Sequence, residues 1–164
     1  MKRIAYAVAA SVALTLALPM ANPGPAAADS TVRSTRTIEY VIARGLSQRG
    51  VPFLYGGGNI AGPTRGTGLN VNTVGFDASG LIQYAFAGAG IKMPRTSGQQ
   101  CSIGRKIPPS QALPGDLICY GPGGAQSVAM YLGNGQMLEG TEPAVMVSPV
   151  RTNGMVPYLT RIID

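Results

Sequence analysis

The chain has 164 residues, with 13 lysine and arginine residues against 7 aspartate and glutamate residues, two cysteines, and neither histidine nor tryptophan. Without histidine, and with two separated cysteines, it lacks the ligands of a typical zinc site, and we expect neither a metal nor a cofactor. A net charge of +6 favours a polyanionic surface such as a bacterial envelope, but no basic run interleaved with aromatic residues points to nucleic acid.

Residues 1–28 are predicted to be a secretory signal peptide. A basic start is followed by an apolar run from Ile4 to Leu18, and Ala26-Ala27-Ala28 offers a cleavage site. The apolar run is too short for a stable membrane span, although an uncleaved membrane anchor is the alternative. We therefore expect a protein secreted to the cell wall or periplasmic space, with a mobile lead-in at 29–36 and one domain over 37–164.

The first half of this domain is expected to be helical. Apolar residues recur at helical spacing from Arg36 to Gln48 and again from Ala78 to Ala89, where Asp77 is well placed as the N-cap. Between them, a glycine-rich loop runs from Gly56 to Gly75 and lacks the Gly-Lys-Ser/Thr ending of a phosphate-binding loop. A further helical turn is predicted over 96–102.

The second half is expected to form strands. Strand-like runs fall at 116–120, 128–132, 136–139 and 145–147. Helices followed by strands predict an α+β domain, in which the N-terminal helices pack on one antiparallel sheet formed by the C-terminal half.

Five segments, taken in order, resemble the NlpC/P60 family of cell-wall cysteine peptidases, and within it the Rip group. The segments are Val51–Gly57, Asp77–Leu81, Pro94–Gln100, Leu113–Ile118 and Ser127–Gly135. The likeness covers about residues 37–160 and implies a papain-like α+β fold. By this resemblance, the family's cysteine corresponds to Ala78, its histidine to Ser127 and its third polar position to Glu139. The pattern is closest to a group member that lacks the catalytic cysteine.

The chemistry of the family explains what these replacements remove. A cysteine in the first turn of a helix has a lowered pKa, and a facing histidine accepts its proton. Alanine at position 78 cannot attack a carbonyl, and the hydroxyl of Ser127 cannot replace an imidazole as a base. The sequence therefore predicts a non-catalytic peptidoglycan-binding protein with a degenerate endopeptidase site.

The resemblance also implies a substrate groove that binds the stem peptides of peptidoglycan. Its lining residues would be Tyr55, Asp77, Ala78, Ser79, Arg95, Ser127 and Glu139. Carboxylates or amines of the stem would pair with Arg95, Asp77 or Glu139. Each of these side chains also has a purely structural interpretation: Asp77 as a helix cap, Tyr55 as a core residue and Arg95 as a tie for the loop between helices.

The position of Glu139 depends on the turn at Asn134-Gly135. If Gly133 also belongs to the loop, residue 129 pairs with residue 139, and Ser127 and Glu139 share one sheet face. A two-residue loop would place them on opposite faces. We choose the three-residue loop, because only that version builds the site.

Two other functions and one covalent feature stay open in the sequence. Ser79 or Ser127 could serve a divergent peptidase that uses Lys92, Lys106 or a carboxylate as base. The domain could instead regulate or compete with active cell-wall hydrolases. Two further residues, Cys101 and Cys119, form either a disulfide or two buried thiols.

Overall fold

The computed structural model describes residues 25–67 and 72–164, so the apolar run of the predicted signal peptide lies outside the described residues. Its elements, in chain order, are α1 (Pro25–Leu46), β1 (Thr64–Arg65), β2 (Val74–Gly75), α2 (Ala78–Ala87), α3 (Ser97–Ser102), β3 (Arg105–Ile107), η1 (Pro109–Gln111), β4 (Leu117–Tyr120), η2 (Pro122–Gly124), β5 (Ser127–Gly133), β6 (Gln136–Gly140), β7 (Val145–Pro149) and β8 (Leu159–Arg161).

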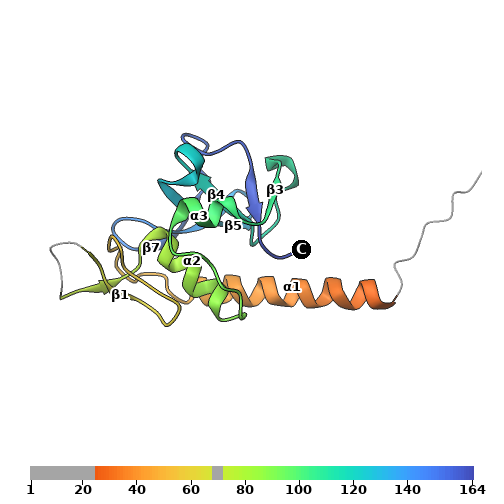
Figure 1. The fold of residues 1–164 in the computed structure, drawn as a ribbon, viewed down its shortest axis with the longest axis horizontal. Coiled ribbons are helices and arrows are strands. Elements are labelled where there is room, and N and C mark those ends of the chain that lie inside the picture. Colours follow the sequence, from red (N-terminus) through yellow and green to blue (C-terminus); the bar gives the residue numbers. More distant parts are fainter. Residues whose placement is uncertain (1–24, 68–71) are drawn as a thin grey trace, which may run out of the picture.

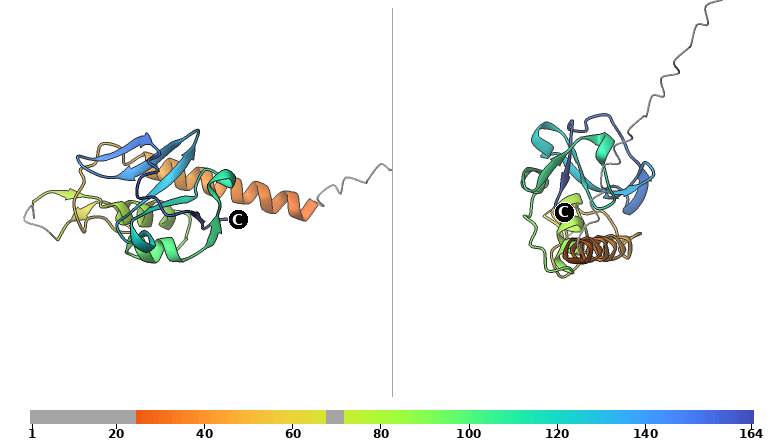
Figure 2. Two further views of the ribbon diagram at one scale, coloured as in Figure 1. Left: turned by 90° about the horizontal axis from the view of Figure 1, so that it is seen from above. Right: turned by 90° about the vertical axis from the view of Figure 1, so that its right-hand side faces the viewer.

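The central element is a six-stranded antiparallel sheet with the order β3-β8-β4-β5-β6-β7. Helices α1 and α2 lie together on one side of it, and the far end of α1 projects past the sheet (Figures 1 and 2). The predicted α+β fold is confirmed. Within the described ranges, no helix combines the length and the apolarity that crossing a membrane requires.

Both faces of the sheet bury apolar side chains. On one face, α2 contributes Leu81 and Phe86, which pack in one cluster with Met130 and Leu138 of the sheet. The opposite face holds a second cluster, whose members include Ile118, Tyr120, Ala129, Met137 and Leu159. Because the central strands are covered on both sides, they read as nearly continuous apolar runs, which made them recognisable in the sequence.

Helix α1 is longer than expected and includes residues 29–36, which we predicted to be a lead-in before the helix. The helix begins at Pro25 and includes the whole segment. Arg33 pairs with Asp29 one turn away at 2.8 Å, and the hydroxyls of Thr31 and Thr35 each donate to a carbonyl one turn earlier. This part of the helix is largely exposed and shows no apolar periodicity, so hydrophobic spacing could not reveal it.

The β5–β6 hairpin has the expected pairing but a different turn. Ala129 faces Glu139, as predicted, and Gly133 pairs with Gln136. The loop therefore contains only Asn134 and Gly135, which adopt φ values of 51° and 69°, and the register shifts between Tyr131 and Gly133. The extra residue lies in β5, at this register shift, and not in the loop, where we predicted it.

Two short strands of the six-stranded sheet were missed: β3 at its edge and β8 next to it. Strands β3 and β8 each have three residues, too few for alternation to be read from the sequence. They matter because β8 carries Thr160, which is fully buried and donates a hydrogen bond to the carbonyl of Cys101, 59 positions away in the chain. This contact ties the C-terminal strand to α3.

Candidate functional site

A cleft of about 570 Å³ opens at the N-terminus of α2. Its walls come from the loop before β1, the start of α3, the segment before β5 and the end of β6. Six of the seven residues predicted to line a groove do line it: Tyr55, Asp77, Ala78, Ser79, Arg95 and Ser127. Glu139 is the exception. The polypeptide thus brings together residues that are spread over 73 positions of sequence.

Ala78 is the first residue of α2 and is nearly buried, with 8% of its surface exposed. Asp77 caps the helix, because its Oδ1 accepts a hydrogen bond from the N–H of Gly80 at 2.6 Å. Strand β6 ends against this helical turn: a Cβ at Gly140 would lie 3.0 Å from the carbonyl oxygen of Asp77. Position 78 is therefore held at the cleft by the helix cap and by the adjoining strand.

The carboxylate of Asp77 does more than cap the helix. It also accepts hydrogen bonds from the Gly56 N–H at 3.1 Å and the Ser79 hydroxyl at 3.2 Å. Arg95 binds both of its oxygens, at 3.0 and 2.9 Å. The side chains of Arg95 and Asp77 are 36% and 16% exposed, so this bidentate ion pair is partly desolvated.

Arg95 connects three segments around the cleft. Besides Asp77, its guanidinium donates to the Ser79 hydroxyl at 2.9 Å and to the Gly57 carbonyl at 3.1 Å. The glycine loop can reach this position because Gly58 has φ of +87°, and a Cβ there would lie 2.2 Å from the ring of Phe76. Arg95 thus fastens the glycine loop to the start of α2.

Ser79 is buried, and its hydroxyl is held between Asp77 and Arg95. Neither lysine considered as a base lines the cleft within the described residues. Lys106 instead donates to the Cys101 carbonyl and lies over the ring of Tyr158. Its pKa is lowered by burial. The geometry gives Ser79 the role of a structural hydrogen-bonding residue.

Tyr55 stands at the rim of the cleft and is 76% exposed. The alternative of a core residue is therefore wrong for this side chain. An aromatic ring with this exposure offers an apolar face and a free hydroxyl to a ligand.

Glu139 is 3% exposed and forms a bidentate ion pair with Arg151, with N–O distances of 2.6 and 2.7 Å. The Ser148 hydroxyl donates to the same carboxylate. Burial acts to raise the pKa of Glu139, but the hydrogen bonds from Arg151 and Ser148 and the charge of Arg151 outweigh it and hold the pKa below its ordinary value. Sequence analysis missed Arg151; its only signal was a basic residue just after the last expected strand.

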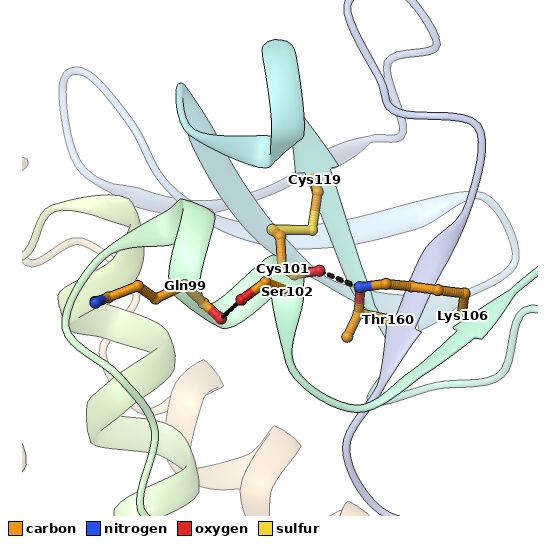
Figure 3. Close-up of a disulfide and its surroundings, with 6 residues drawn as sticks. All are labelled: Gln99, Cys101, Ser102, Lys106, Cys119 and Thr160. Carbon is orange, nitrogen blue, oxygen red and sulfur yellow. Dashed lines mark hydrogen bonds between the residues drawn. A yellow bond between two sulfur atoms is a disulfide. The ribbon is translucent and has the colours of Figure 1, made fainter.

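The disulfide between Cys101 and Cys119 joins α3 to β4 (Figure 3). The turn at η2 packs directly on it, because a Cβ at Gly124 would lie 2.6 Å from the Cβ of Cys101. Ala125 and Gln126 follow this turn and form part of the cleft wall. The disulfide therefore supports one side of the cleft. Among residues 25–67 and 72–164, no cluster of three or more metal-ligating side chains occurs.

The model of the NlpC/P60 family matches residues 50–164, which include the whole cleft. The chain belongs to the NlpC/P60 family. Peptidoglycan endopeptidase RipB of Mycobacterium tuberculosis is 52% identical to this family member over 158 residues, covering 92% of the chain and 66% of RipB. RipA of the same species is 59% identical over 128 residues, or 77% of the chain, which spans only 27% of RipA.

Solved structures of the Rip group share the fold. RipD of Mycobacterium tuberculosis matches with a TM-score of 0.75 and 68% identity, covering 77% of this chain and 98% of that structure. RipD is described as a non-catalytic NlpC/P60 domain protein adapted to peptidoglycan binding. RipA has been solved with mutations at a cysteine, a histidine and a glutamate, which follow one another at separations of 49 and 12 positions.

Proposed function

We propose that this chain is a secreted, non-catalytic peptidoglycan-binding protein whose cleft is a degenerate NlpC/P60 endopeptidase site. One observation carries the proposal: alanine and serine line the cleft at positions 78 and 127, in a sequence that contains no histidine. The separations from Ala78 to Ser127 and from Ser127 to Glu139 are 49 and 12 positions, which equal those between the three mutated residues of RipA.

Physical chemistry supports the loss of catalysis. The N-terminus of α2 would lower the pKa of a thiol at position 78, but a methyl group has no lone pair. Ser127 supplies a hydroxyl in place of the base, and a neutral hydroxyl is too weak a base to accept a proton from a nucleophile at neutral pH. The Ser79 hydroxyl is bonded to Asp77 and Arg95, which argues against Ser79 as the nucleophile of a divergent serine peptidase. Peptidoglycan binding by RipD, 68% identical, supports the retained binding role.

Removing the nucleophile and the base leaves the recognition surface intact. The cleft keeps its exposed aromatic rim at Tyr55, its helix cap and the Arg95 tie. In such a site, binding energy is expressed in the complex with the ligand and is not used to stabilise a transition state. The N-terminal signal peptide, with cleavage after Ala28, would deliver the protein to the cell wall.

Co-sedimentation with insoluble peptidoglycan tests the proposal. The protein should pellet with the wall at low salt and should release no new amino termini. Tyr55→Ala should weaken retention by about fivefold, equivalent to ~1 kcal/mol, because it removes the exposed ring at the cleft rim.

Tyr40→Ala is the matched control, since Tyr40 is 50% exposed but lies on α1 and does not line the cleft. Its retention should equal that of the wild type. If the wild-type protein stays in the supernatant at low salt, the binding function is wrong. If Tyr55→Ala and Tyr40→Ala behave alike, the wall is bound elsewhere on the molecule.

A further inference from the structure

The charged side chains of the cleft neutralise one another. Asp77 and Arg95 are the only charged residues that line it among those described. The two oxygens of Asp77 accept five hydrogen bonds, from Gly56, Ser79, Gly80 and twice from Arg95. This carboxylate has little capacity left for an amine of a ligand.

The hydrogen-bond donors of Arg95 are also largely used within the protein. The two terminal nitrogens of Arg95 make four hydrogen bonds, two to Asp77 and one each to Ser79 and Gly57. A ligand carboxylate could take the bidentate position on this guanidinium only by displacing Asp77, whose side chain is 16% exposed and would lose its ion-pair partner. The exchange would trade one partly desolvated ion pair for another and would lose the bonds that hold the glycine loop.

The positive N-terminus of α2 also already has a negative partner within the protein. A helix N-terminus attracts anions through its dipole and its free N–H groups. Here the carboxylate of Asp77 takes that place and accepts the Gly80 N–H at 2.6 Å. Glu139, the remaining carboxylate of the predicted groove, does not line the cleft and is bound by Arg151.

The uncharged polar side chains that line the cleft carry hydroxyls and one amide. Ser79 and Thr96 hydrogen-bond to neighbouring side chains. The others are Tyr55, Thr67, Ser97, Gln126, Ser127 and Thr141. Hydroxyl and amide groups both donate and accept, so they match the carboxamides and peptide groups of a ligand. A free carboxylate or ammonium in the same place would lose hydration without gaining an opposite charge, which costs far more than burying a neutral amide that is hydrogen-bonded.

We propose that the cleft selects an uncharged peptide segment and discriminates against free carboxylates, so that amidated stem peptides are its preferred ligands. This inference rests on the proposed peptidoglycan-binding function and specifies the ligand of the same site. The inference also separates two effects. The net positive charge attracts the protein to the cell wall at long range, whereas the cleft itself binds neutral groups of the ligand.

The test uses two synthetic stem peptides that are identical except that one carries carboxamides where the other carries free side-chain carboxylates. Binding to the purified protein is measured by NMR titration at low and high salt. The amidated peptide should bind about tenfold more tightly, and its affinity should change little with salt, because no net charge meets another across the contact. Equal affinities, or tighter binding of the acid, would overturn the inference while leaving wall binding intact.

Two variants give the experiment a positive control. Ser127→Lys and Thr141→Lys each add an unpaired cation at a partly exposed position of the cleft. Each should shift the preference toward the acidic peptide and make its binding salt-dependent; if neither does, the charge argument is wrong. If neither peptide binds the wild-type protein although that protein still pellets with peptidoglycan, the inference fails and peptidoglycan binds elsewhere on the molecule. If the protein also does not pellet with peptidoglycan, the proposed function itself fails.

Discussion

Replacing Arg151 with methionine should lower the free energy of unfolding, because the buried carboxylate of Glu139 loses its ion-pair partner. The carboxylate is 3% exposed, and Arg151 supplies two of its hydrogen bonds, at 2.6 and 2.7 Å. Breaking a buried ion pair by removing one partner costs roughly 3–5 kcal/mol. The Arg151 side chain is 50% exposed, and Ser148 still donates to the carboxylate. We therefore expect Arg151→Met to lower the free energy of unfolding by about 2 kcal/mol.

Urea denaturation at several pH values measures this effect. With an m-value of about 2 kcal/mol/M, the midpoint at neutral pH should fall by about 1 M. Arg33→Met is the matched control, because its ion pair with Asp29 is exposed on both sides and should contribute less than about 0.5 kcal/mol.

The pH dependence has opposite signs in the two proteins. In the wild type, the pKa of Glu139 is lowered on folding, so the carboxylate contributes stability above its unfolded pKa, near 4, and this is lost as the pH falls through the lower folded pKa. In Arg151→Met, burial dominates and raises that pKa, so acid relieves a penalty. The stability difference should therefore narrow as the pH drops from neutral through about 4. A difference that is no larger than that of Arg33→Met, or that widens in acid, would refute the reasoning.

Three further predictions concern the cleft and its supports. Ala78→Cys combined with Ser127→His should restore measurable cleavage of peptidoglycan fragments, detected as new amino termini; a folded but inert double variant would indicate that the cleft has changed beyond these two groups. Asp77→Ala should lower the free energy of unfolding by about 2–3 kcal/mol in chemical denaturation, because it removes a helix cap and leaves Arg95 partly buried and unpaired, whereas an effect below about 1 kcal/mol would contradict the network. Reducing the Cys101–Cys119 disulfide should cost ~3 kcal/mol of stability and weaken peptide binding, because one cleft wall packs on it; unchanged affinity in the reduced, folded protein would exclude that support.

Much of the fold could be predicted because its signals are local. The N-cap at Asp77, the helical spacing that follows it and the apolar strands over 117–147 each depend on residues close in the sequence. The errors have local causes as well. The exposed start of α1 has no apolar periodicity, and the register shift in β5 has no sequence signature, although the predicted pairing of residue 129 with residue 139 was correct.

The structure shows where the predicted site residues lie and what they bind. Six of the seven residues do line the cleft, but Asp77 and Arg95, expected to pair with charged groups of a ligand, bind each other. The structure therefore favours the interpretation of both as structural residues. Glu139 does not line the cleft and is bound by Arg151 and Ser148, and neither partner was considered from the sequence.

The sequence by itself determined which residue types are available at the start of α2 and in the chain as a whole. Histidine is absent from the chain and alanine stands at the first position of α2, and both facts follow from residue identity and local helix signals. Only the tertiary structure decided which charges are left for a ligand. Asp77 meets Arg95 across 18 positions and Glu139 meets Arg151 across 12, and such pairings are set by distances between chain segments that no local pattern encodes. Among the described residues, the two charged side chains that line the cleft, Asp77 and Arg95, therefore pair with each other, and Glu139 pairs with Arg151 outside the cleft lining.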